Sequence, residues 1–166
     1  MNNIQIKKSV FNDFVDRCNW PSYPDWAKYS DFHNIGSPKI FWDYINKENK
    51  ICYSIFNLRN GSSNLVGFLL INQDDDCASF GLIIHPNWLS KGIGGKVILK
   101  TLFHCFYFLN VNTVKGCIHR NNKNMLSIVS KITHKFTKLD SDVFEYFINK
   151  KDYVRNKRLF EIILKK

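Results

Sequence analysis

The chain has 166 residues, of which 45% are hydrophobic and 15% aromatic. This composition excludes a disordered chain, and the length suits one domain with its own core, which we expect to span residues 1–166. The formal net charge of +10 is uneven: residues 1–90 hold 8 Lys and Arg against 9 Asp and Glu, whereas residues 91–166 hold 16 against 5. The second half therefore suits an anionic ligand, although a solvated basic face is the simpler explanation for the C-terminal lysines.

Membrane and metal functions find no support in the composition. The sequence lacks a run of about 18 apolar residues and an N-terminal apolar signal segment, so we expect a cytoplasmic protein with no membrane partner. Its five cysteines are widely spaced, without a Cys-x-x-Cys pair or a Cys/His ligand pattern. We expect them to be reduced, and we expect no metal site.

Apolar periodicity predicts the elements in chain order. Segments typical of strands are residues 3–8, 51–59, 64–72, 77–85, 113–119 and 143–148. Segments typical of helices are residues 10–18, a stretch opening at Ser37-Pro38, residues 96–110 and residues 125–132. Residues 153–164 fit either a strand or a helix. Asn60-Gly61 predicts a tight hairpin, so the strands before the longest helix form an antiparallel meander.

An aromatic loop at residues 19–26 follows the first helix. It could line a substrate cleft, but packing over the core is the favoured interpretation, because exposed aromatic residues are costly.

The most informative stretch follows the strand at residues 77–85. Pro86 is followed by glycines at positions 92, 94 and 95, and helical apolar spacing then begins. Such a turn exposes N–H groups at the positive end of a helix, and Lys91 and Lys96 add charge beside it, which suits a phosphate group. Neither the Gly-x-Gly-x-x-Gly pattern nor the P-loop pattern fits, and a plain glycine-rich turn is the alternative.

This stretch resembles motif A of the GNAT superfamily of N-acetyltransferases, in which a strand, a Gln/Arg-x-x-Gly-x-Gly/Ala loop and a helix bind the pyrophosphate of acetyl-CoA. Residues 89–94 match both glycines, whereas Leu89 replaces the expected Gln or Arg. The predicted element order also agrees with that superfamily over nearly the whole chain. The resemblance implies an α/β GNAT fold: a mixed, mostly antiparallel sheet flanked by helices, with a splay between the fourth and fifth strands.

The segment at residues 119–136 is similar to a second family pattern, an Asn followed by a helix. Either Asn122 or Asn124 can be the family asparagine, and the register stays open. In the second register, Ser127 falls on the serine with which Rim-type ribosomal-protein N-terminal acetyltransferases protonate the thiolate. The cofactor-binding residues that the resemblance implies are Ile83, Ile84, His85, Leu89, Ser90, Lys91, Gly92, Ile93, Gly94, Gly95, Lys96, Asn122 and Asn124.

The usual catalytic side chains of the family are missing here. Ser79 stands where many relatives carry Glu, and in the Asn122 register Val129 stands where a Tyr often acts as the acid. His85 is the preferred base because imidazole titrates near neutral pH, although a His before Pro is often only a surface residue. Ser127 is the candidate acid. The weaker candidates for the base are His119, Asp76 and water.

The resemblance implies direct transfer of an acetyl group from acetyl-CoA, in a ternary complex, to a primary amine on a protein N-terminus, a lysine or a small molecule. Two alternatives stay open. A tRNA-directed acetyltransferase toxin would use the basic second half to bind nucleic acid. A non-catalytic acyl-CoA-binding or interaction protein would explain Ser79 and Val129. Both a monomer and a homodimer are compatible with the sequence.

Overall fold

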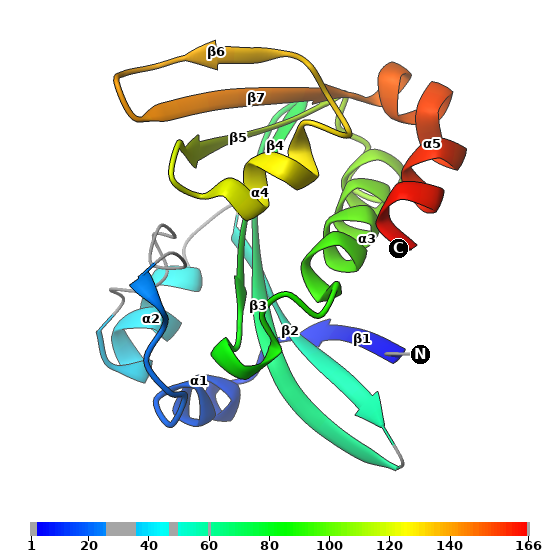
Figure 1. Cartoon of the computed structure of the whole chain (residues 1–166). Coiled ribbons are helices and arrows are strands. Elements are labelled where there is room, and N and C mark those ends of the chain that lie inside the picture. The colour runs from blue at the N-terminus through cyan, green and yellow to red at the C-terminus, as the bar shows by residue number, and fades with distance from the viewer. Residues whose placement is uncertain (1–2, 26–35, 47–49, 60, 166) are drawn as a thin grey trace. The chain divides into compact units, whose positions relative to one another are not determined.

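The computed structural model describes residues 3–25, 36–46, 50–59 and 61–165 (Figure 1). Within these residues the chain forms a seven-stranded sheet of order β1-β2-β3-β4-β5-β7-β6. The strands are β1 (Asn3–Lys8), β2 (Lys50–Arg59), β3 (Ser62–Asp74), β4 (Cys77–Ile84), β5 (Thr113–His119), β6 (Phe136–Lys138) and β7 (Val143–Asn149). The helices are α1 (Phe11–Arg17), α2 (Pro38–Ile45), the 3-10 turn η3 (Pro86–Trp88), α3 (Ile93–Tyr107), α4 (Lys123–Val129) and α5 (Lys150–Lys165).

Strand pairing in this sheet is mostly antiparallel, as predicted. The β1–β2, β2–β3, β5–β7 and β6–β7 pairs are antiparallel, whereas β4 and β5 run parallel, with Cys77–Ser79 opposite Thr113–Lys115. The mixed sheet flanked by helices is therefore confirmed. The expected divergence of β4 and β5 beyond Ser79 stays a prediction.

The chain divides into two compact units, each of which is described by itself. The first unit comprises Met1–Asn72 and Gly81–Gly94, and the second comprises Gln73–Phe80 and Gly95–Lys166. Strand β4 and helix α3 each begin in one unit and end in the other. The single domain expected over residues 1–166 stays a prediction.

Aromatic packing builds the core of the first unit, where α1 and α2 lie beside each other (Figure 1). The ring of Phe14 on α1 lies edge-on to Phe41 on α2, with centroids 4.8 Å apart, and stacks on Phe68 of β3 at 4.9 Å. All three side chains are fully buried. Such ring pairs add about 0.5–1.5 kcal/mol beyond their apolar burial, so they hold both helices against the sheet.

The second unit confirms the periodicity predicted for α3. Its buried apolar positions are Val97, Ile98, Leu102, Cys105 and Phe106. Residues 153–164, for which the sequence left strand and helix open, lie within helix α5. The ring of Tyr153 on α5 lies 5.1 Å from that of Phe106 on α3 and anchors the helix. On the neighbouring strands, Tyr146 lies opposite Gly116, where an added Cβ would come within 2.6 Å of the tyrosine oxygen.

Candidate functional site

The turn after β4 is tied to the neighbouring strand by a β-bulge. Ile55 pairs with Gly67 while Phe56 pairs with Leu65, so Val66 is the extra residue of β3. A bulged residue is not part of the regular hydrogen-bond ladder between the strands. The carbonyl oxygen of Val66 instead accepts a hydrogen bond from the backbone N–H of His85, with an N···O distance of 2.9 Å. The bulge therefore fixes the point at which β4 ends.

Gly67 allows β4 to approach β3 closely at the same point. A Cβ built on Gly67 would lie 2.6 Å from the carbonyl oxygen of Ile83 and 3.0 Å from Cδ1 of Ile84. Since the nearest of these atoms belongs to the backbone of β4, that strand would have to move before position 67 could carry any side chain. Sequence reasoning missed this role, because an isolated glycine in a strand signals a bulge or a close approach without naming the partner.

The loop at residues 89–94 contains two residues with left-handed backbone. Ser90 and Gly92 both adopt left-handed backbone, with φ of 58° and 73°. Residues that alternate between left- and right-handed conformations turn successive N–H groups toward one side, which forms a concavity for anions. A Cβ on Gly92 would meet no heavy atom within 4 Å, so the backbone angle is what requires glycine there.

Helix α3 begins immediately after this turn, at Ile93. Its first-turn N–H groups have no intrahelical acceptor, and the first turn contains no acidic residue but includes Lys96. Ile93 is fully buried and anchors the start of the helix. The glycine turn and the start of the helix thus lie where the sequence predicts them, while the phosphate site itself stays a prediction.

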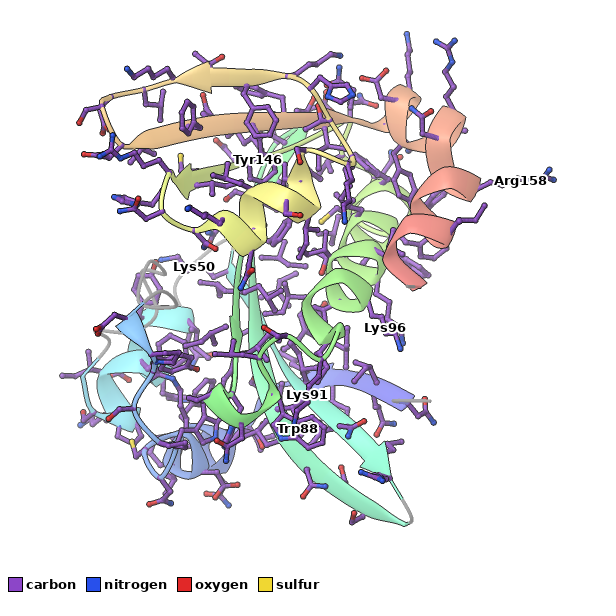
Figure 2. All side chains as sticks on the ribbon, in the orientation of Figure 1. Lys50, Trp88, Lys91, Lys96, Tyr146 and Arg158 are labelled. Atoms are coloured by element: carbon purple, nitrogen blue, oxygen red, sulfur yellow. The ribbon has the colours of Figure 1, made fainter. Side chains whose placement is uncertain are left out.

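A lysine and a tryptophan meet at this loop. The ammonium nitrogen of Lys91 lies 4.8 Å from the ring centroid of Trp88, within the range of a cation–π interaction (Figure 2). Trp88 is the last residue of η3, and its backbone N–H donates to the carbonyl oxygen of His85 at 2.8 Å.

His85 caps the 3-10 turn through its side chain. Its Nδ1 accepts a hydrogen bond from the backbone N–H of Asn87 at 3.0 Å, and its ring lies 4.8 Å from the ring of Trp20. Burial lowers the pKa of His85 below its ordinary value; a backbone hydrogen bond opposes this shift, and the positive charge of Lys91 adds to it. The imidazole is therefore neutral at neutral pH, and accepting at Nδ1 assigns its proton to Nε2.

The aromatic loop packs on the core around the end of β4. The hydroxyl of Tyr23 donates to the carbonyl oxygen of Ile84 at 2.8 Å, and burial raises the pKa of Tyr23 while Arg17 opposes that rise. Trp20 and Tyr23 both pack against the core of the first unit. The favoured interpretation of this loop is confirmed for these two residues, and Trp26 lies outside the described residues.

Asn122, Asn124 and Ser127 lie at or on α4 in the second unit, so their relation to the glycine loop stays a prediction. Asn122 caps α4, with its side-chain oxygen accepting from the N–H of Met125 at 3.1 Å. Asn124 and Ser127 are exposed on the helix, whereas Val129 is fully buried.

The described residues contain no group of three or more His, Cys, Asp or Glu side chains suited to a metal ion. Asp76, one of the weaker base candidates, accepts two hydrogen bonds from the side-chain amide of Asn112, at 2.9 and 3.0 Å. All five cysteines have free thiols. In the part of the chain that the structure describes, no helix is both long and apolar enough to cross a bilayer.

Solved structures with this fold include several N-acetyltransferases. A spermidine N-acetyltransferase from Vibrio cholerae in complex with CoA and spermine aligns over 91% of this chain and 98% of its own, with 15% identity and a TM-score of 0.69. The N-acetyltransferase PseH of Campylobacter jejuni aligns over 89% and 98%, with 18% identity and a TM-score of 0.65. A domain from Methanocaldococcus jannaschii aligns over 89% and 100%, with 19% identity and a TM-score of 0.69. No protein-family model and no curated protein sequence matches the chain.

These likenesses show that the chain has the fold of the GNAT N-acetyltransferases. At identities below 20% they establish the fold, and function must come from the site. The finer resemblance to Rim-type enzymes stays a prediction.

Proposed function

We propose that this protein is an acetyl-CoA-dependent N-acetyltransferase that acts by direct transfer in a ternary complex. The observation that carries the proposal is the loop at residues 89–94. Ser90 and Gly92 in this loop have left-handed backbone, and α3 begins directly after them. A solved N-acetyltransferase structure that holds CoA has the same fold. The loop N–H groups, Lys91 and Lys96 would hold the diphosphate, and the open space at Gly92 is compatible with that group.

The reaction needs a held thioester and a neutral amine. The amine nitrogen attacks the carbonyl carbon, the carbonyl electron pair moves onto oxygen, and collapse of this adduct expels the CoA thiolate, which ends protonated by the proton that the amine loses. Orientation and N–H donors toward the oxyanion supply most of the catalysis in such a site. Of the three N–H groups proposed for this task, that of His85 is already bonded to the carbonyl oxygen of Val66. Because N–H groups alternate in direction along a strand, that of Ile83 points the same way as that of His85, and the task falls to the N–H of Ile84.

His85 and Ser127 are the proposed proton carriers. His85 is neutral at neutral pH, as a base must be, but its lone pair at Nδ1 accepts from Asn87, so proton transfer requires that bond to open. Ser127 is exposed on α4 and would protonate the thiolate. Water is the alternative carrier for either proton.

We propose that the acceptor is a primary amine that carries little other positive charge, such as a protein N-terminus, a lysine or a small amine. The Vibrio cholerae structure holds spermine, which is a polycation. This chain has a formal net charge of +10, which opposes the approach of polycations and favours neutral or acidic carriers. An acidic peptide with a free N-terminus should therefore be a better acceptor than spermidine.

A second candidate function is acyl-CoA binding without turnover. It is favoured by Ser79, which stands at the usual position of the family's Glu, and by the full burial of apolar Val129 on α4. This candidate predicts tight binding of acetyl-CoA with no release of free thiol for any amine.

Thermal unfolding with increasing acetyl-CoA tests the proposal, because a ligand that binds only the folded state raises the midpoint with its occupancy. The shift should disappear in Gly94→Glu, which places a carboxylate at the loop, and should persist in Ser63→Glu, an equal charge change at an exposed position of β3. Thiol release with an amine panel then separates the enzyme from the binding protein. No shift at millimolar acetyl-CoA would overturn both functions.

A further inference from the structure

The contact between Lys91 and Trp88 joins the glycine loop to the turn before it. The two residues are three positions apart, and the left-handed backbone at Ser90 lies between them. The chain thereby folds back, and the ammonium nitrogen lies 4.8 Å from the centre of the indole ring (Figure 2). Lys91 is exposed, whereas Trp88 is half-buried.

The indole ring belongs to a turn that is held from several sides. The N–H of Trp88 donates to the carbonyl oxygen of His85, and the N–H of Leu89 donates to that of Pro86, at 2.8 and 3.2 Å. The side chain of His85 accepts from Asn87 in the same turn. These bonds fix the backbone of η3, and the half-burial of the ring restricts its rotamers, so the ring offers an ordered surface for the lysine.

A lysine held in this way is better prepared to bind an anion. A free lysine side chain populates many rotamers, and about 2 kcal/mol of rotamer entropy is at stake when it is immobilised. The ring attracts the ammonium through its π face, so N–H donors remain for phosphate oxygens. Part of the ordering cost is then met before the ligand arrives, which raises affinity.

We propose that Trp88 is a positioning residue of the anion site, holding the Lys91 ammonium where it meets the phosphate groups of acetyl-CoA. This inference rests on the proposed function and adds to it a residue that the motif resemblance does not include. Trp88 acts through Lys91 and need not touch the ligand. Lys96 lies in the first turn of α3 and is the matched lysine for comparison.

A double-mutant cycle on acetyl-CoA affinity tests the inference, with the dissociation constant measured by calorimetry in low salt. Trp88→Leu should weaken binding by about 2- to 5-fold, the size of an exposed cation–π contact. In the Lys91→Ala background the same change should have no further effect, whereas in the Lys96→Ala background it should keep its full effect. Trp88→Phe keeps an aromatic face and should retain most of the affinity.

The outcomes separate this inference from the function on which it rests. Equal losses from Trp88→Leu in the wild-type and Lys91→Ala backgrounds would show that the ring does not act through Lys91 and would overturn the inference alone. Wild-type protein that binds no acetyl-CoA would overturn both. Because Trp88→Leu removes a half-buried ring, its unfolding midpoint is measured as well. If Trp88→Leu is unfolded, Trp88→Met replaces it in the cycle, since Met is a flexible apolar side chain without a π face.

Discussion

The hydroxyl of Tyr23 donates a 2.8 Å hydrogen bond to the carbonyl oxygen of Ile84, the last residue of β4. It joins the aromatic loop after α1 to the strand end from which the glycine loop departs, across 61 positions of sequence. The loop therefore helps to fix the end of β4, in addition to covering the core.

Tyr23→Phe should lower the free energy of unfolding by about 0.5–1.5 kcal/mol, because it removes the hydroxyl while keeping the ring packed. Chemical denaturation of both proteins measures this difference. If this hydrogen bond also positions the end of β4 against the thioester of acetyl-CoA, the variant should have a lower kcat and an unchanged affinity for acetyl-CoA. Unchanged stability would show that water replaces the hydroxyl at no cost.

Gly67→Ala should be among the most damaging small substitutions in the first unit. The added methyl would lie 2.6 Å from the carbonyl oxygen of Ile83, so β4 must shift, at a cost of about 1–3 kcal/mol in unfolding free energy. Gly36→Ala is the matched control, since its methyl would meet only the flexible end of Ile40 at 3.3 Å. Similar midpoints for the two variants would contradict the close approach.

Gly92→Ala should strain the loop through its backbone alone, because the space around the position is open and φ is 73°. The expected loss is about 1–2 kcal/mol of stability, the cost of left-handed backbone for an L-residue. Gly92→Asn should lose less, since Asn tolerates this conformation. Calorimetric unfolding of the three proteins checks the order, and an equal loss for Asn and Ala would point to a steric cause instead.

The pH dependence of the protein should reflect His85, whose pKa burial lowers. A lowered pKa in the folded state means that the unfolded chain binds the proton more readily, so stability is full above the ordinary pKa of His and falls as the pH drops through the lower, folded value. His85→Asn can still accept from Asn87 and should flatten this acid dependence. Unfolding midpoints between about pH 4 and pH 8 measure it, spanning the ordinary pKa of His.

The same variant tests His85 as the base. Asn cannot take a proton, so loss of the base should lower the rate by about 10²- to 10⁴-fold and remove the acid limb of the pH–rate profile. His85→Ala, which also loses the cap, serves as the comparison for folding. A His85→Asn enzyme with an unchanged profile would leave His85 as a cap of η3 alone.

Much of the fold followed from local patterns. The apolar spacing along α3 matches its buried positions, and the two-residue hairpin joins β2 to β3 at Arg59 and Ser62, with Asn60 itself outside the described residues. Strand β6 was not predicted. Its three residues, Phe136–Lys138, carry no strand periodicity, and their pairing with β7 is a non-local choice.

The sequence by itself determined the order of the elements and the glycine turn before α3, because hydrophobic period and glycine backbone freedom act over a few residues. Only the tertiary structure decided that the carbonyl of Val66 meets His85, that Nδ1 of His85 caps η3, and that Lys91 lies over Trp88. Such contacts depend on bulge register, left-handed φ values and the approach of distant strands. None of these features produces a recognisable pattern of apolar and polar residues in the sequence, since each depends on how the chain packs in three dimensions.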